Sequence, residues 1–352
     1  MRVLMLGMTF GTPGSQMGEF RSRRGHELRF LAAEGTADLT ASAHPTYTFA
    51  ATETAAAAVE RIAAQWRPDA LVCYTPELFP PPLEIEACPI LTAALISDWT
   101  IYHAQLESNL ARYDVVLSDR LGSQSLRLNG ATPQYLFPLY SQCSRLHRKL
   151  DIEKDVDVAF VGNLNHAIHI ERGRCLERIA ALSDRYRILI ATELLGDDYV
   201  RALNRARIVF NHALRREMNL RCFEALACGS LLFLERNNLE VHDYLRDREE
   251  VVLYTPDTLV PLLQHFLDAP GEAARIAAQG HAKAGPLALE NRLDALFDWL
   301  ECQPPGPRPF TRFPPAQQAF ATIMQYASSL VDTQRDWAAA RLADARRQSP
   351  RD

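Results

Sequence analysis

The feature that most constrains this chain is an alternation of short apolar runs with helical segments, which occurs twice along its length. In the first half we predict strands at residues 2–8, 26–32, 70–74, 89–97 and 114–118, followed by a final apolar run at 134–139. One helix is predicted to end near residue 24, and two more are predicted at 52–65 and 104–111. In the second half we predict strands at 156–161, 186–191, 207–211, 230–235 and 251–254, with helices at 169–182, 199–206, 220–228 and 259–267. Such alternation is typical of parallel sheets covered by helices. We therefore predict an α/β fold of two Rossmann-like, doubly wound lobes facing a central cleft.

The predicted domains follow from the chain length and from two polar segments. A chain of 352 residues is longer than one hydrophobic core usually organises. Residues 140–155 are polar and lack periodicity, so we place a first lobe at 1–150 and a second lobe at 151–302. The remainder, 303–352, starts with a proline-rich crossing segment and continues as a polar helix, which we expect to cross back as a hinge.

Charge and cysteine content exclude several classes of protein. The 43 acidic and 38 basic residues give a net charge of −5, so we expect no nucleic acid partner. The seven cysteines are scattered without a CxxC pair, which argues against a disulfide framework or a zinc knuckle. The apolar start is too short for a signal sequence, and no run reaches the roughly 18 apolar residues of a membrane span. We expect a cytoplasmic protein without a transmembrane segment, for which peripheral membrane contact remains open.

Candidate site residues come from loops that follow predicted strands, because parallel sheets bind ligands beyond the carboxyl ends of their strands. Gly162 and Asn163 follow the strand 156–161, and the next helix carries Arg172 and Arg174. A glycine at this place lets a diphosphate approach the main chain, and an arginine neutralises its charge. The alternative is an ordinary turn followed by solvated arginines.

A second loop, from Asn211 into the helix that ends before Gly229, contains Glu224. The neighbours of Glu224 on this helix are apolar enough to be buried, and a buried carboxylate needs polar partners. One explanation is an internal ion pair with Arg215 or Arg221. The other is a bond to the two ribose hydroxyls of a nucleotide, which a carboxylate accepts well.

The run from Asn219 to Gly229, NLRCFEALACG, resembles the donor-site signature of group 1 glycosyltransferases of the GT-B fold, particularly those similar to spore-maturation CgeB proteins. Weaker companions surround it in order: FVG at 160–162, FN at 210–211 and LLFL at 231–234. Together these motifs cover about residues 155–285, whereas the first lobe matches only in the order of its elements.

This resemblance implies transfer of a sugar, in the first place a hexose, from a nucleoside diphosphate sugar with retention of configuration. It implies Glu224 on the donor ribose and Gly162, Arg172 and Arg221 near the diphosphate. The full donor-binding set is Gly162, Asn163, Arg172, Asn211, Asn219, Arg221 and Glu224. Many related transferases carry a Glu-x7-Glu pair, but Arg216 stands at the first position here and Glu217 comes one residue late, so we do not expect Glu217 to contact the sugar.

The first lobe offers weaker candidates. Asp98 follows the strand 89–97, where similar enzymes present a histidine or aspartate to the sugar, although it is equally suited to cap a helix. His103 is a second catalytic candidate, for which a packed or solvent-facing histidine is the simpler explanation. Gly11 and Gly14 form a possible phosphate or acceptor loop that matches neither GxGxxG nor a Walker motif. Glu77 is a candidate to line the acceptor side, or else an ordinary turn residue.

The sequence predicts neither a metal site nor a cofactor beyond the donor itself. His166 and His169 are placed for one helix face without a clustered acid, and the pair Asp155 and Asp157 precedes its strand. We therefore expect arginines and helix dipoles to stabilise the leaving group. The acceptor, whether a glycan, a lipid-linked group or a protein, is not specified. Two alternatives stay open, a sugar-nucleotide epimerase and a degenerate, non-catalytic scaffold.

Overall fold

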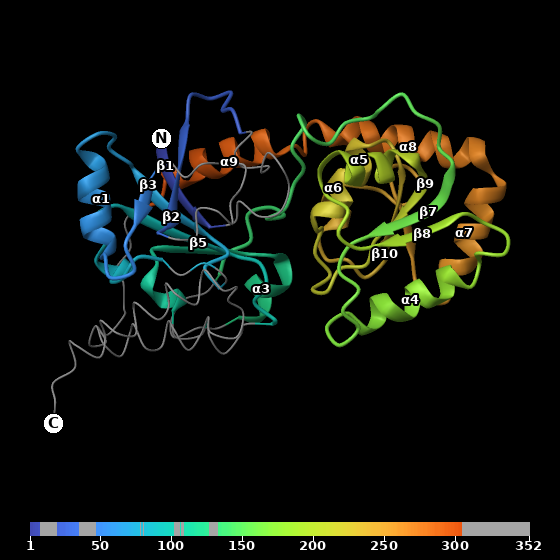
Figure 1. Cartoon of the computed structure of the whole chain (residues 1–352), viewed down its shortest axis with the longest axis horizontal. Helices are drawn as coiled ribbons and strands as arrows, with labels where there is room; N and C mark the ends of the chain where they lie inside the picture. Colours follow the sequence, from blue (N-terminus) through green and yellow to red (C-terminus); the bar gives the residue numbers. More distant parts are fainter. Residues whose placement is uncertain are drawn as a thin grey trace. The chain divides into compact units, whose positions relative to one another are not determined.

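The structure is a computed structural model that describes residues 1–7, 20–34, 47–77, 79, 81–101, 106, 109–126 and 133–304. Contacts divide these residues into two units, each built on its own parallel sheet (Figure 1). The first unit holds the described residues up to Phe137, apart from Phe20, together with those from Leu293 onward. The second unit holds Phe20 and Pro138–Arg292.

Six strands form the first sheet: β1 (Arg2–Gly7), β2 (Glu27–Ala33), β3 (Tyr47–Phe49), β4 (Ala70–Tyr74), β5 (Leu91–Ile96) and β6 (Val115–Ser118). All are parallel, in the order β3-β2-β1-β4-β5-β6. Val3 of β1 pairs with Leu28 of β2 on one side and with Ala70 of β4 on the other. The central strands are buried on both faces, which is why they read as continuous apolar runs.

Helices cover this sheet and their starts are capped by side chains. In α1 (Ala55–Ala63) the hydroxyl of Thr54 accepts a hydrogen bond from the N–H of Ala57 at 3.2 Å. The apolar stripe of α1 packs into the core of the first unit. In α3 (Arg120–Ser125) the carboxylate of Asp119 accepts from the N–H of Gly122 at 2.7 Å. Two short 3₁₀ helices complete the described connections, η2 (Ile85–Ala87) and η3 (Leu110–Arg112).

The division between the two units falls within α9 (Leu289–Glu301), which returns the chain to the first unit. Asp294 of α9 accepts from the hydroxyl of Ser22 and from the N–H of Arg23, and Asp298 contacts His26 at 2.8 Å. Residues 20–26 are held against α9 in an irregular conformation, so the predicted helix ending near residue 24 is wrong there. The segment 305–352, with the predicted helix at 316–347, lies outside the described residues.

Five parallel strands form the second sheet in the order β11-β10-β9-β7-β8. They are β7 (Val156–Val161), β8 (Ile188–Ala191), β9 (Ala206–Phe210), β10 (Leu231–Glu235) and β11 (Val252–Tyr254). The helices are α4 (Ile170–Ala180), α5 (Gly196–Arg205), α6 (Leu220–Ala227), α7 (Leu259–Asp268) and α8 (Pro270–Ala284), with the 3₁₀ helix η4 (Val241–Asp243). One apolar cluster joins the sheet to α5 and α6, and another joins it to α4, α7 and α8 (Figure 1).

Each sheet has one point at which the strand order reverses, between β1 and β4 in the first unit and between β7 and β9 in the second. Ligands of open parallel sheets bind at such points, beyond the carboxyl ends of the strands. At the first reversal point Gly7 has φ of 122°, and a Cβ atom there would lie 1.9 Å from the carbonyl oxygen of Tyr74. Only glycine allows the two strand ends to approach so closely.

The α/β class with two doubly wound parallel sheets is confirmed. The apolar run at 134–139 adds no strand to the first sheet, because Gln134 makes only an isolated bridge to Leu117. Residues 140–150, predicted as linker, belong to the second unit, where Tyr140 and Leu150 pack against its core. The contacts therefore divide the chain upstream of residue 150, at Phe137.

Candidate functional site

Arg221, in the first turn of α6, joins the two strands that flank the reversal point of the second sheet. Its Nε and Nη2 donate to the carbonyl oxygen of Val161, the last residue of β7, at 2.9 and 2.5 Å. Its Nη1 donates to Oδ1 of Asn211, directly after β9, at 2.7 Å. Asn211 is fully buried, and the hydroxyl of Tyr254 donates to its main-chain carbonyl at 2.8 Å. The predicted residues Asn211 and Arg221 therefore belong to one network.

The glycine at position 162 makes room for this guanidinium. A Cβ atom on Gly162 would lie 2.1 Å from Nη2 of Arg221. The guanidinium also lies over the ring of Phe160, 4.3 Å from its centroid, which is a favourable cation–π geometry. Gly162 therefore leaves the space that the guanidinium of Arg221 occupies at the carboxyl end of β7.

Arg172, in the first turn of α4, ties together the loops that follow the same two strands. Its Nε and Nη2 donate to the carbonyl oxygen of His212 at 3.0 and 2.8 Å, and its Nη1 donates to that of Asn163 at 3.2 Å. Burial, with a further contribution from the charge of Arg221, lowers the pKa of Arg172 to about 10. Arg172 is therefore still charged at neutral pH. Within the described residues neither Arg172 nor Arg221 forms an ion pair with a carboxylate.

His169 and His212 respond to this concentration of positive charge. Burial, and then the charges of Arg172, Arg215 and Arg221, lower the pKa of His169 to about 4. Burial also lowers the pKa of His212. Both imidazoles are therefore neutral at pH 7, and the positive potential comes from the guanidinium groups. Such a potential at the ends of parallel strands is suited to an anionic ligand.

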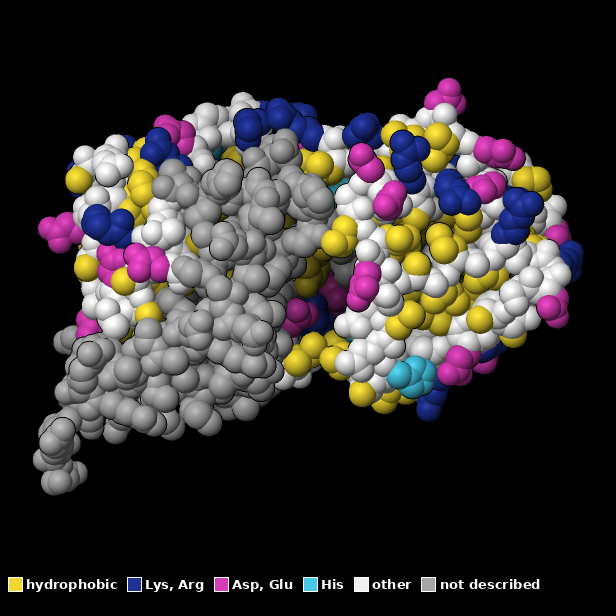
Figure 2. All heavy atoms as spheres, in the orientation of Figure 1, with side chains coloured by type: hydrophobic (Ala, Val, Ile, Leu, Met, Phe, Trp, Pro, Cys, Tyr) yellow, Lys and Arg dark blue, Asp and Glu magenta, His cyan; other side chains and the backbone are white. Residues whose placement is uncertain are grey.

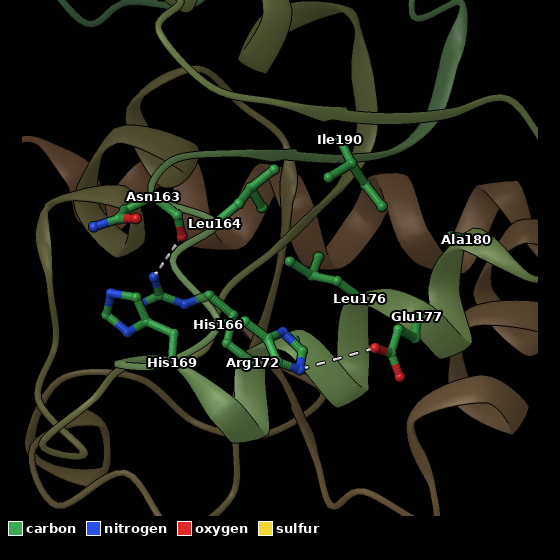
Figure 3. A pocket seen from close by; sticks show the side chains of 10 residues that line it. Asn163, Leu164, His166, His169, Arg172, Leu176, Glu177, Ala180 and Ile190 are labelled. Atoms are coloured by element: carbon green, nitrogen blue, oxygen red, sulfur yellow. Dashed lines mark hydrogen bonds and ion pairs between the residues drawn. The ribbon is translucent and has the colours of Figure 1, made fainter.

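A pocket of about 270 Å³ lies beside this cluster, between α4, β8 and the loop after β7 (Figure 3). Its lining residues are Asn163, Leu164, His166, His169, Arg172, Gly173, Leu176, Glu177, Ala180 and Ile190. The ring of His166 lies so close to α4 that a Cβ atom on Gly173 would be 2.2 Å from it, and its Nε2 is 4.0 Å from Oε1 of Glu177. Hydrophobic side chains gather on the surface of the second unit over β8 (Figure 2). The pocket is therefore apolar at its floor and polar where it meets Arg172.

Glu224 lies one helical turn beyond Arg221 on α6, and the residue is only 4% exposed. Tyr199 of α5 donates its hydroxyl to Oε2, and Nε2 of His147 lies 3.4 Å from Oε1. Burial raises the pKa of Tyr199 well above its usual range, so this phenol stays protonated and donates. The alternative ion pair with Arg215 or Arg221 is not observed among the described residues.

Two buried glutamates at this edge were not selected from the sequence as site residues. Glu217 accepts from the N–H of Arg215 at 2.7 Å and lies 3.3 Å from its guanidinium. Glu235, the last residue of β10, accepts from Nδ2 of Asn238 at 3.0 Å, and its Oε2 has no partner among the described residues. Burial raises the pKa of Glu235 to about 8. Its position directly after four apolar strand residues is a signal that would have identified it.

In the first unit, Glu77 and Asp98 lie together at the carboxyl ends of β4 and β5. The main-chain N–H of Asp98 donates to Oε1 of Glu77 at 2.7 Å. Glu77 is fully buried and Asp98 is half-buried. The main-chain carbonyl of Asp98 accepts from the N–H of Ile101 in a turn. The next residues, 102–105, lie outside the described part, so the predicted helix after Asp98 stays a prediction.

The remaining candidates divide into those that the structure places and those that it does not. Asn219 is the N-cap residue of α6, and its main-chain carbonyl accepts from the N–H of Cys222 at 3.0 Å. Arg174 is exposed and pairs with Glu171 at 2.6 Å. Three candidates, Gly11, Gly14 and His103, lie outside the described residues. Five of the predicted donor-binding residues form one cluster: Gly162, Asn163, Arg172, Asn211 and Arg221.

Within the described residues no group of three or more His, Cys, Asp or Glu side chains is placed to hold a metal ion. All seven cysteines are free thiols, six of them buried, as expected for small apolar residues. The described helices include none that is long and apolar enough to cross a membrane.

Comparison with known families places this cluster in a glycosyl transferase-like region. Residues 144–296 match the family model described as glycosyl transferase-like, a range that starts before β7 and ends within α9. The match contains every residue of the Arg172 and Arg221 network. No curated protein matches the chain in sequence. The narrower resemblance to CgeB-like proteins remains a prediction.

Solved structures, among them an alpha-glucosyltransferase, share the fold. An alpha-glucosyltransferase in complex with UDP-glucose and DNA containing an abasic site matches with a TM-score of 0.59 at 10% identity, over 85% of this chain and 98% of that one. Sucrose-phosphate synthase from Thermosynechococcus elongatus matches with a TM-score of 0.56 at 12% identity, over 86% and 98%. The trehalose-6-phosphate phosphatase N-terminal domain of Candida albicans gives 0.57 at 11% identity, over 86% and 97%. At these identities the similarity establishes the fold, which is of the GT-B type.

Proposed function

We propose that this chain is a glycosyltransferase that takes its sugar from a nucleoside diphosphate sugar, and that the second unit binds this donor. The observation that carries the proposal is the pair of arginines, Arg172 and Arg221, held at the reversal point of the second sheet without carboxylate partners among the described residues. The glycosyl transferase-like match of residues 144–296 supports it.

The chemistry of sugar transfer needs positive charge at this place. As the bond between the sugar and the diphosphate breaks, negative charge develops on the leaving nucleoside diphosphate. Arg172 and Arg221 are already fixed by hydrogen bonds to main-chain and amide oxygens, so they stabilise that charge without reorganisation. We propose that Gly162 and Asn163 lie along the diphosphate, that a hexose is transferred with retention of configuration, and that no metal ion is required.

We propose that Glu224 binds the donor ribose, with Asn211 and Asn219 completing the donor site. Glu224 already contacts Tyr199 and His147, so it must bind the ribose in the presence of these two partners or in place of them. Each carboxylate oxygen accepts more than one hydrogen bond, so ribose hydroxyls either add to the contacts from Tyr199 and His147 or replace them. The site is thereby built around a carboxylate whose position is fixed before the donor arrives.

For the acceptor we propose the first unit, with Asp98 orienting the transferred sugar and Glu77 beside it. His103, Gly11 and Gly14 remain candidates for the same side. The acceptor class, a glycan, a lipid-linked group or a protein, stays a prediction, as do the cytoplasmic location and the absence of a nucleic acid partner.

Titration calorimetry with UDP, GDP, dTDP, ADP and CMP tests the donor site. We expect one nucleotide to bind in preference to the others, and Glu224→Ala to weaken it at least tenfold, because a hydrogen bond to a charged group contributes about 1.5–3 kcal/mol. Asp268→Ala, which removes an exposed carboxylate at the end of α7, serves as the matched control and should bind as the wild type does. Tyr199→Phe leaves Oε2 of Glu224 without its phenol partner and should bind equally well or more tightly.

Other results of these measurements would support one of the two alternative functions. If no nucleotide binds at millimolar concentration to demonstrably folded protein, the non-catalytic scaffold replaces the transferase. If a nucleotide sugar binds and NMR spectra show an altered sugar still attached to the nucleotide, the epimerase replaces it. Where sugar is transferred, the anomeric signals of the product test retention, and activity in EDTA tests independence of metal.

A further inference from the structure

Glu77 holds the turn that follows β5 in the first unit. It comes shortly after β4 and is completely buried. Its Oε1 accepts three hydrogen bonds, from the N–H of Ser97 at 2.7 Å, the hydroxyl of Ser97 at 3.0 Å and the N–H of Asp98 at 2.7 Å. One carboxyl oxygen thus fixes the two residues that lead out of the strand.

The second oxygen of Glu77, Oε2, is buried and has no hydrogen-bond partner among the described residues. Burial raises the pKa of Glu77 above its ordinary value, although the hydrogen bonds from the N–H groups of Asp98 and Ser97 oppose this rise. Because Oε1 already accepts three donors, Oε2 is the oxygen that can carry a proton. A neutral carboxyl adds no second negative charge beside Asp98.

The backbone around Glu77 is also constrained. Thr75, two residues earlier, is fully buried and has φ of 52°, which is unfavourable for a residue with a branched side chain. Just before it, Tyr74 meets Gly7 at the reversal point of the sheet. Such strain persists only where the surrounding structure imposes it, and it is concentrated at functional sites.

We propose that Glu77 is a positioning residue that, as a neutral carboxylic acid, holds the turn at Ser97 and Asp98 so that Asp98 is presented at the carboxyl edge of the first sheet. This proposal rests on the proposed function, because orienting the sugar is the role given to Asp98. Glu77 itself does not contact the reacting atoms. Its contribution is the geometry of one turn and the absence of a competing charge.

The opposite end of β5 supplies a matched control. There Asp114 accepts from the N–H and the hydroxyl of Thr92 at 2.8 and 3.0 Å, the same kind of contact that Glu77 makes with Ser97. Asp114 lies at the amino edge of the sheet, where ligands of parallel sheets do not bind. Asp114→Asn should therefore disturb β5 locally and leave sugar transfer unchanged.

The experiment compares the wild type with three variants: Glu77→Gln, Glu77→Ala and Asp114→Asn. For each protein we measure the affinity for UDP, the release of UDP from UDP-glucose, the amide NMR shifts of Ser97 and Asp98, and the infrared spectrum. We expect a carboxylic acid band at neutral pH that Glu77→Gln removes. Glu77→Gln keeps an oxygen acceptor and should retain UDP release within about threefold. Glu77→Ala should lower kcat by on the order of 10²-fold with unchanged UDP affinity, because small misplacements of a positioned group have such effects.

The outcomes separate this proposal from the proposed function. Failure of folded wild-type protein to bind any of UDP, GDP, dTDP, ADP and CMP overturns the donor site, while the infrared band and the amide shifts still decide the state of Glu77. Equal activity of Glu77→Ala and Asp114→Asn overturns the positioning role. Loss of activity in Glu77→Gln together with retained UDP affinity and unchanged amide shifts overturns the neutral-acid role, because it shows that an ionised carboxylate is required.

Discussion

Replacing Arg221 tests the network at the second reversal point most directly. Arg221→Met removes the donors to Val161 and Asn211 and the charge over Phe160, but keeps a long apolar side chain. Leaving a buried acceptor without its partner costs about 1–3 kcal/mol, and the cation–π contact contributes about 0.5–2 kcal/mol. Relief of repulsion with Arg172 offsets part of this loss. We expect a net loss of about 3 kcal/mol of unfolding free energy.

Calorimetry and NMR measure this prediction independently of any activity. For a unit of this size, each kcal/mol shifts the transition by about 2–4 °C, so the second unit should unfold roughly 6–12 °C lower. The charge of Arg221 is one cause of the low pKa of His169, so that pKa should rise from about 4 toward its ordinary value of 6.5 in the variant. Arg174→Met, which removes an exposed arginine of α4, should change neither quantity.

The refuting result is specific. If Arg221→Met loses less than about 1 kcal/mol, in the range of ordinary surface substitutions, and His169 titrates as before, then Arg221 does not bridge β7 and β9 as described. If stability falls as expected but UDP binds with unchanged affinity, the network is structural and Arg221 has no part in donor binding.

Three further predictions concern stability. Glu235→Gln should reduce the pH dependence of the free energy of unfolding. Burial raises the pKa of Glu235 from 4.5 to about 8, so the wild type loses on the order of 5 kcal/mol of stability as pH rises through this window. Urea denaturation at several pH values measures this loss. Gly280→Ala should lower the melting temperature, because its Cβ atom would lie 2.4 Å from the main-chain oxygen of Glu250, and overpacking costs about 1–3 kcal/mol. Gly173→Ala should instead raise the free energy of unfolding by about 0.5–1 kcal/mol, because alanine favours a helix and the exposed ring of His166 can turn away from the new methyl group. A free energy of unfolding below that of the wild type would show that His166 is fixed.

Burial decides how far the strands were predictable. The strands 70–74 and 156–161 have the predicted bounds because residues buried on both faces of a parallel sheet form unbroken apolar runs. β3 has only three residues with a threonine in the middle, so it leaves no such run. The run at 134–139 follows Pro133 and contains Pro138, and neither proline has the N–H group that a central strand needs.

The site was predictable as a set of loops, and its internal contacts were not. The rule that ligands bind at the carboxyl ends of parallel strands selected Gly162 and Asn211 without knowledge of the fold. Most of the acceptors that fix Arg172 and Arg221 are main-chain oxygens, which every residue carries and which leave no trace in a sequence. Likewise Glu224 contacts side chains that lie 25 and 77 positions earlier in the chain, Tyr199 and His147.

The charges at the second reversal point connect stability with ligand binding. Glu217 pairs with Arg215, and Glu235 is largely protonated at neutral pH because burial raises its pKa to about 8. Within the described residues the guanidinium groups of Arg172 and Arg221 therefore donate to carbonyl and amide oxygens rather than to carboxylates. Keeping Arg172 charged here has a cost, because burial first, and then the charge of Arg221, lower its pKa. A bound diphosphate would remove that cost, so the same arrangement that weakens the protein at this edge gives it affinity for an anion.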